Sequence, residues 1–156
     1  MNLFVAAWED NTKALDEMLS AGQDVNELFD GDSALYAAVE NSCLSSMNLL
    51  LERGADTEIE MRGWSPLRWA VESEFCAGTE NLWPLQGNDY RRPIPSVSGL
   101  LLFFGADPFR VDSEGQNAYE YARSRGHESF VALVDGRVGP ACAEQSVSPK
   151  SDRAGG

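Results

Sequence analysis

The sequence is short of basic residues and of histidine. It has 12 Lys or Arg against 25 Asp or Glu, and a single histidine, so its formal charge is −13. An acidic field repels phosphate groups, so we expect neither nucleic acid nor a membrane surface as a partner. Negative charge also aids solubility. Solubility alone explains poorly why residues 1–60, with thirteen acidic and two basic side chains, carry −11 of the total. This asymmetry predicts a partner protein with a basic surface.

Residues and motifs typical of catalysis and metal binding are also scarce. The three cysteines, Cys43, Cys76 and Cys142, are far apart and form no C-x-x-C pair, which predicts neither a disulfide framework nor a zinc site. We find no glycine-rich phosphate loop and no nucleophile elbow. We therefore expect a protein that is not an enzyme and uses no cofactor or metal. An enzyme would require His127, the one histidine, to be exposed beside carboxylates in a cleft.

Long hydrophobic runs are missing. Nothing in the sequence approaches the length of a transmembrane helix. The first ten residues, MNLFVAAWED, have neither the basic start nor the apolar core of a signal peptide. Together with the unpaired cysteines, these observations predict a protein of the reducing cytoplasm. A length of 156 residues suits one domain.

An internal repeat is present. The stretch LLLERGAD at 49–56 returns as LLLFFGAD at 100–107 and, more weakly, as MLSAGQD at 18–24. A second motif precedes these stretches, as SALYAA at 33–38, SPLRWA at 65–70 and NAYEYA at 117–122. Ser or Asn at the start of this motif can cap a helix, and a glycine after the leucines can end one. Each unit therefore predicts two helices that bury a face only against their neighbours.

These segments resemble ankyrin repeats, whose unit is a β-turn followed by two helices with a T-P-L-H-x-A signature. The resemblance covers roughly residues 2–134. It implies an all-α, ankyrin-type helical repeat solenoid with short β-hairpin connections. It also implies a structural role for His127, in the Gly-His pair of the family. The expected helices are 2–9, 12–20, 34–41, 44–53, 66–74, 96–104, 118–124 and 128–135.

The third repeat is longer than the others. From Ser33 to Gly54 is 21 residues, but from Ser65 to Gly105 is 40. We expect a repeat domain over 1–135 with an inserted loop at 75–95, and a disordered Gly-, Ser- and Pro-rich tail at 136–156. The loop either folds back on the helices or binds the partner, and in the second case its anchors are Trp83, Tyr90, Arg91 and Arg92.

The resemblance also implies where a partner binds, namely at hairpin tips and at exposed positions of the first helices. The residues predicted there are Trp8, Glu9, Phe29, Asp30, Asp32, Glu40, Arg62, Trp64 and Glu72. Phe29 and Trp64 could instead pack on neighbouring hairpins. We expect Trp69 to belong to the core.

Two functional hypotheses remain from the sequence. The first is a small inhibitor of a basic protein, because acidic, stand-alone ankyrin-like proteins of this style include immunity proteins that neutralise bacterial toxins. The alternative is a regulatory scaffold or adaptor that binds a peptide or a transcription factor. We expect a monomer when the chain is free.

Overall fold

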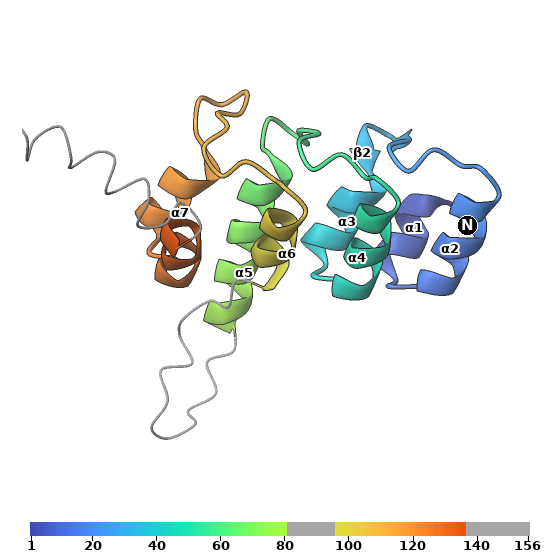
Figure 1. Cartoon of the computed structure of the whole chain (residues 1–156), viewed down its shortest axis with the longest axis horizontal. Coiled ribbons are helices and arrows are strands. Elements are labelled where there is room, and N and C mark those ends of the chain that lie inside the picture. Colours follow the sequence, from blue (N-terminus) through green and yellow to red (C-terminus); the bar gives the residue numbers. More distant parts are fainter. Residues whose placement is uncertain (81–95, 137–156) are drawn as a thin grey trace, which may run out of the picture.

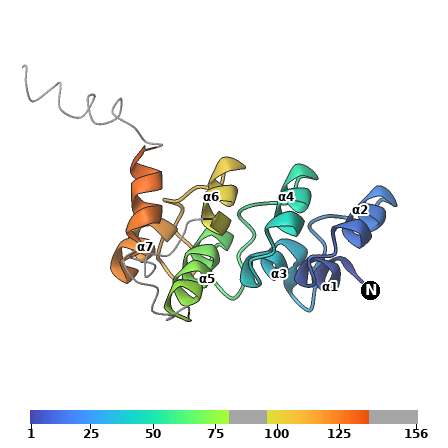
Figure 2. The ribbon, with the colours of Figure 1, turned by 90° about the horizontal axis from the view of Figure 1, so that it is seen from below.

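The protein is a row of helix pairs. The computed structural model describes residues 1–80 and 96–136, except the side chains of 77–80. Figure 1 shows the pairs following one another along the long axis, with loops projecting from one edge. Seen from below, α1, α3, α5 and α7 form one layer, and α2, α4 and α6 form a second (Figure 2). The bounds are α1 Leu3–Trp8, α2 Thr12–Ser20, α3 Ala34–Glu40, α4 Leu44–Glu52, α5 Pro66–Glu80, α6 Ser96–Phe103 and α7 Ala118–Arg125, and residues 128–136 are also helical.

The helices of the first layer begin where the sequence places a capping side chain. The Tyr36 amide donates to Ser33 Oγ at 3.1 Å, and the Glu120 amide donates to Asn117 Oδ1 at 2.8 Å. The Ser65 hydroxyl accepts in the same way at the start of α5. Each bond satisfies an amide that has no partner inside its own helix. The expected and observed helix starts therefore agree closely.

The leucine stretches and the glycines after them behave as the repeat predicts. Leu50 and Leu101 are fully buried between the layers. Gly54 and Gly105 follow α4 and α6 with φ of +88° and +96°, a backbone conformation that a side chain disfavours. Beyond each glycine, the amide of Ala55 or Ala106 donates back to the carbonyl of Leu50 or Leu101 at 3.0 Å, which closes the helix end.

Close packing within the first layer relies on alanine. Ala38, Ala70 and Ala122 occupy the same position of their repeats, and all three are fully buried. A small side chain at this position lets neighbouring helix backbones approach. The fold class expected from the sequence is confirmed, with helix ends that differ by one or two residues in most cases.

One expected boundary is wrong. α5 continues beyond residue 74 to Glu80, so residues 75–80 are helical and do not belong to a loop. Phe75 helps to hold this added length, because the Arg125 guanidinium lies 4.4 Å from the centre of its ring. The remainder of the predicted insertion, including Trp83, Tyr90, Arg91 and Arg92, lies outside the described residues. The predicted tail lies outside them as well, apart from Gly136.

Two helices of the second layer are capped by carboxylates from the first-layer side of the molecule. Asp10, just after α1, accepts from both the amide and the hydroxyl of Ser46 in α4, each at 2.8 Å. Glu74 of α5 accepts from the amide of Ser98 in α6 at 2.7 Å and from its hydroxyl. These contacts fix the two layers to each other and place the surface built on the first layer.

Candidate functional site

Short hairpins stand at the start of the first-layer helices and present side chains at fixed spacing. In the first, β1 (Leu28–Phe29) pairs with β2 (Asp32–Ser33). Asp30 and Gly31 between them have φ of +54° and +91°, the type I′ geometry that matches the twist of paired strands. The second hairpin repeats this with Arg62 and Gly63, at +55° and +82°. Asp30 and Arg62 therefore occupy equivalent tips. We call the hairpins together with the exposed side of α1, α3, α5 and α7 the first-helix face.

The N-terminal part of this face is acidic and carries an exposed tryptophan. Trp8 at the end of α1 is 42 % exposed and stacks on Phe4, with ring centres 6.4 Å apart. Glu9, Asp30 and Glu40 are exposed. An exposed aromatic ring on an acidic face is a favourable anchor for an aliphatic or cationic side chain of another protein.

An ion pair links the first two hairpins. Arg62 Nη2 lies 3.3 Å from Asp32 Oδ2, and the side chains are 62 % and 19 % exposed. The guanidinium also lies 5.5 Å from the centre of the Tyr36 ring. Burial, with the negative charge of Glu40 in second place, raises the pKa of Tyr36 to about 12. The phenol is thus neutral at any physiological pH.

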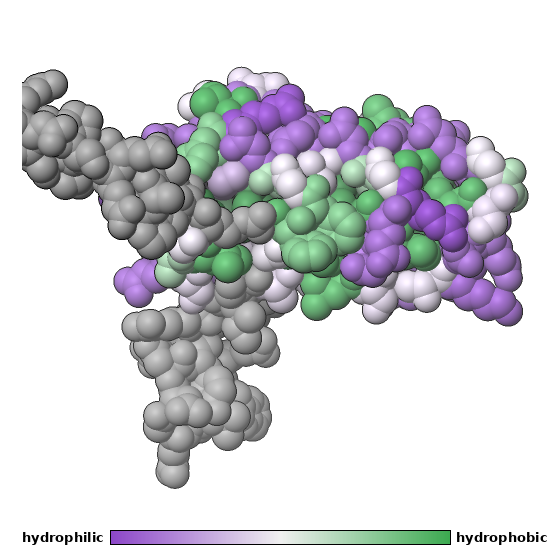
Figure 3. All heavy atoms as spheres, viewed as in Figure 1, coloured by the Kyte–Doolittle hydropathy of each residue, from purple (hydrophilic) through white to green (hydrophobic). Residues whose placement is uncertain are grey.

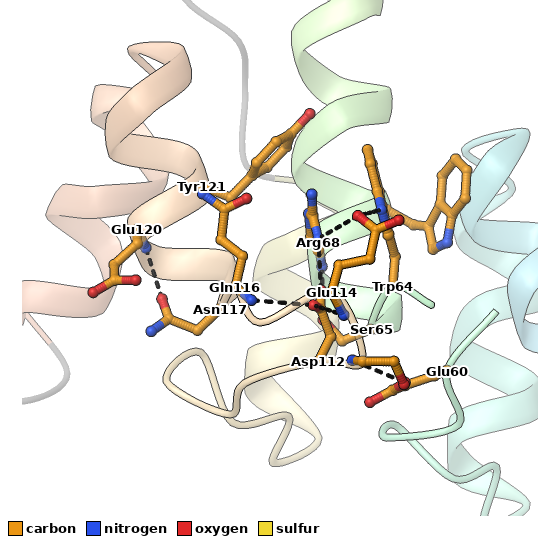
Figure 4. Close-up of polar contacts among 12 residues, drawn as sticks. Glu60, Trp64, Ser65, Arg68, Asp112, Glu114, Gln116, Asn117, Glu120 and Tyr121 are labelled. Carbon is orange, nitrogen blue, oxygen red and sulfur yellow. Dashed lines mark hydrogen bonds and ion pairs between the residues drawn. The ribbon is translucent and has the colours of Figure 1, made fainter. Parts of the chain in front are cut away.

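Trp64 belongs to a cluster of rings between the second hairpin, α5 and α7, drawn in Figure 4. Its ring centre is 4.7 Å from that of Trp69 and 5.4 Å from that of Tyr121. Its indole N–H donates to Glu114 Oε2 at 2.6 Å. Glu114 lies in the turn at 112–116, closed by the Asp112 amide donating to the Gln116 carbonyl at 3.0 Å, and we call this turn the third hairpin. The structure therefore shows the packing on neighbouring hairpins that the sequence left as one of two alternatives for this residue.

Arg68 passes through the middle of this cluster and is buried. Its guanidinium lies 3.9 Å from the centre of the Trp64 ring and 4.7 Å from that of Tyr121. It donates to Asp112 Oδ2 at 2.9 Å, where the side chains are 6 % and 0 % exposed. Burial raises the pKa of Asp112, but hydrogen bonds from Arg68 and from the amides of Gln116 and Glu114 outweigh it, so the pKa is lowered overall. The carboxylate is held ionised and ties the third hairpin to α5.

Farther along the face, Glu72 connects α5 with α7. It accepts from the Tyr121 hydroxyl at 2.6 Å and from Arg125 at 3.1 Å. Burial and this bond to Glu72 raise the pKa of Tyr121 to about 12. Trp64, Arg68, Tyr121 and Glu72 thus form a continuous set of contacts, in which the indole N–H, the phenol, the Glu72 carboxylate and one terminal nitrogen of Arg68 have internal partners. Charges of both signs are paired in this half of the face, in contrast to the acidic N-terminal half.

His127 lies in a structural network. It is fully buried, and its Nε2 is 2.8 Å from Glu74 Oε2, while its Nδ1 accepts from the Phe130 amide at 3.2 Å. This bonding requires the proton on Nε2. Ser98 also contacts Glu74, but the carboxylate lies between serine and histidine. A catalytic triad needs the histidine in the middle and an exposed nucleophile. The requirement that the sequence set for an enzyme, an exposed His127, is not met.

The predicted partner-binding residues fall into three groups. Trp8, Glu9, Asp30, Glu40 and Arg62 are exposed, whereas Phe29, Asp32, Trp64 and Glu72 are half-buried. The third group, in the insertion, lies outside the described residues. Sequence reasoning missed the three residues that organise the face, Tyr36, Arg68 and Tyr121. They stand at variable positions of the repeated motif, and their size was the only available signal.

Residues 1–80 and 96–136 contain neither a metal-binding cluster nor a membrane span. No three His, Cys, Asp or Glu side chains gather there in a way that could hold a metal ion. No helix of this described part combines the length and apolarity needed to cross a bilayer.

Comparison with protein families gives a match to the model described as ankyrin repeats, with three copies over residues 3–84. Comparison with curated proteins gives no match. The matched residues cover more than half of the chain, and ankyrin repeats are a non-enzymatic class of protein–protein interaction module. The stacked helix pairs, the hairpins and the family match agree, and the chain belongs to the ankyrin-repeat family.

Proposed function

We propose that this protein is an inhibitor that neutralises a basic partner protein, such as a toxin, by covering it with the acidic part of the first-helix face. The observation that carries the proposal is the exposure of four side chains on this face, Trp8 and Glu9 at the end of α1, Glu40 at the end of α3 and Asp30 at the tip of the first hairpin. Residues 1–60 hold −11 of the chain's formal charge of −13. The proposal places the protein in a reducing compartment, the cytoplasm.

Electrostatics and packing would have separate roles in such a complex. Exposed carboxylates attract a basic surface over a distance of about 10 Å at 0.1 M salt, which speeds encounter. Trp8 acts after encounter, because a ring that becomes buried at an interface slows dissociation. A partner with a cationic active site would lose its activity simply because the site is covered.

The first experiment compares charge removal at two places. Asp30 has φ of +54°, which asparagine tolerates better than lysine does, so Asp30→Asn with Asp32→Asn removes two charges without backbone strain. The matched control is Glu17→Gln with Glu52→Gln, two exposed positions in α2 and α4. Partner capture from source cells with the wild-type chain, followed by rate measurements on the captured protein, supplies the readout.

We expect the variant of the first hairpin to slow association about three- to tenfold at low salt and to leave dissociation nearly unchanged. The control should change neither rate by more than about twofold. Trp8→Ala should speed dissociation instead. The proposal is wrong if the captured partner is acidic, or if both charge variants bind like the wild type. The inhibitor role is tested by adding the chain to the partner at equal concentration and measuring the partner's activity.

A second candidate function, an adaptor, has one observation in its favour. Phe103, Phe109 and Val111 are 75 %, 47 % and 56 % exposed, at the end of α6 and in the connection that follows. Figure 3, in which the second layer faces the viewer, shows hydrophobic side chains gathered on this face around α6 and α4. Two separate binding surfaces are what an adaptor requires. Phe103→Ser would remove a captured protein that the Asp30 and Asp32 variant retains, if the adaptor function is correct.

A further inference from the structure

The contact between Arg62 and the first repeat brings a cation onto an acidic, aromatic position. Tyr36 and Glu40 are four residues apart in α3 and therefore share one side of that helix. Asp32 approaches from the first hairpin, and Trp69 packs edge-on against Tyr36 with ring centres 5.3 Å apart. The Arg62 guanidinium lies over the Tyr36 ring, 5.5 Å from its centre. Together these residues form a site, which we call the seat, that can bind one cationic side chain.

The Tyr36 hydroxyl indicates that this seat is incompletely filled. Tyr36 is 2 % exposed, and its hydroxyl is fully buried without a hydrogen-bond partner among the described residues. Besides burial, the charge of Glu40 and its hydrogen bonding to the phenol both contribute to the raised pKa of Tyr36, although the contact between the two side chains does not meet normal hydrogen-bond distance and angles. Arg68 Nε is also unpaired, but the guanidinium lies against the Trp64 and Tyr121 rings, which compensate a cation. A buried hydroxyl without a partner costs stability and marks a place where a ligand can supply one.

We propose that Asp32, Tyr36 and Glu40 form a subsite for an arginine side chain of the partner protein, and that Arg62 occupies this subsite in the free chain. The proposal rests on the proposed function, since it specifies which side chain the acidic face recognises. Arg62 is a weak occupant. Its side chain is 62 % exposed, and it reaches Asp32 at 3.3 Å with one nitrogen. An exposed ion pair of this kind is easily displaced.

Arginine fits this seat better than lysine. A guanidinium is planar, so it can stack on the face of Tyr36 while its fork of N–H groups donates to separate acceptors. Carboxylates are available on two sides, from Asp32 of the hairpin and Glu40 of the helix, and the Tyr36 hydroxyl is a third acceptor. An ammonium group has the charge but neither the plane nor the fork.

The experiment uses two fluorescein-labelled peptides as probes, (Gly-Arg-Gly-Ser)₃ and (Gly-Lys-Gly-Ser)₃, titrated at low salt with the full chain. Arg62→Ala removes the internal competitor, and we expect it to tighten binding of the arginine peptide about two- to fivefold. Arg110→Ala is the matched control, because Arg110 is an exposed arginine paired with Glu58 at 3.4 Å in another part of the chain. This control changes the net charge by the same amount as Arg62→Ala, and we expect it to raise the affinity for the arginine peptide by less than about 1.5-fold.

A second variant tests the hydroxyl. Tyr36→Phe in the Arg62→Ala background should weaken binding of the arginine peptide at least about fivefold, because a hydrogen bond to a charged group is lost. The thermal midpoint of the free chain should stay the same or rise, since the hydroxyl has no internal partner to lose. A purely structural role of Tyr36 would give the opposite pattern, with lower stability and unchanged binding.

The outcomes separate the two proposals. Tighter binding of the arginine peptide in Arg62→Ala, beyond both the Arg110→Ala control and the lysine peptide, supports the subsite. If Arg62→Ala binds the arginine peptide like Arg110→Ala, or if the affinity for both peptides rises equally, the subsite proposal is wrong while the acidic recognition face stands. A wild-type chain that binds neither peptide contradicts the acidic face itself, and the subsite with it.

Discussion

Arg68 and Arg62 offer a direct measurement of how burial changes the value of an ion pair in this protein. Both are arginines of the third repeat that contact an aspartate of a neighbouring hairpin. The pair of Arg68 with Asp112 has side chains that are 6 % and 0 % exposed, whereas the pair of Arg62 with Asp32 has 62 % and 19 %. Replacing each arginine by methionine keeps much of the aliphatic volume and removes the charge.

The magnitudes follow from what each aspartate retains. Without Arg68, the Asp112 carboxylate stays buried with only two amide donors, from Glu114 and Gln116, at 3.0 and 3.2 Å. Removing one partner of a buried pair costs about 3–5 kcal/mol. The contacts of the guanidinium with the Trp64 and Tyr121 rings are lost as well. Without Arg62, Asp32 still contacts solvent, so Arg62→Met should cost about 0–1 kcal/mol.

Urea unfolding followed by circular dichroism measures the difference. With a slope of about 2 kcal/mol per M, Arg68→Met should lower the midpoint by about 2 M, and Arg62→Met by less than about 0.5 M. Because Arg68 joins α5 to the third hairpin, hydrogen exchange should show the first loss of protection in α7, before α3. Equal midpoints for the two variants would refute the argument from burial. Loss of protection starting at α3 would refute the assigned role in repeat docking.

Leu101→Ala, at a fully buried position of α6, should lower the free energy of unfolding by about 2–5 kcal/mol in the same urea assay, and a near-neutral result would contradict its place between the layers. Glu74→Ala removes the acceptor of buried donors from Ser98 and His127 and should cost about 3–5 kcal/mol, with Glu74→Gln recovering part of the loss; equal costs for the two variants would contradict this network. Because the pKa of Asp112 is lowered in the folded chain, its carboxylate contributes fully to the free energy of unfolding at pH values above its unfolded pKa of about 3.9. This contribution is lost as the pH falls through the folded pKa. The difference in stability between wild type and Asp112→Asn should therefore be constant from pH 7 to about pH 5 and shrink at lower pH, and a difference that persists to about pH 2 would refute it.

The sequence by itself determined the repeat fold, because the signals that start and stop each helix are local. Ser33 caps the helix that follows it, and Gly54 ends the helix that precedes it, through contacts within a few residues. A buried leucine such as Leu101 could be placed by spacing alone. These signals recur in phase, so the layers and the hairpins could be predicted before any contact between repeats was known.

The tertiary structure decided what the face made by those hairpins consists of. Trp64 suited either an exposed anchor or a packed ring, and its contacts come from Glu114 and Tyr121, about fifty residues later in the chain. The same is true of Arg62, whose partners Asp32 and Tyr36 belong to the preceding repeat. Contacts of this kind depend on how side chains at variable positions meet across two repeats, and the repeat pattern carries no information about variable positions. The physical division is between hydrogen bonds closed within one helix, which the local sequence specifies, and contacts between repeats, which exist only once the helix pairs have stacked.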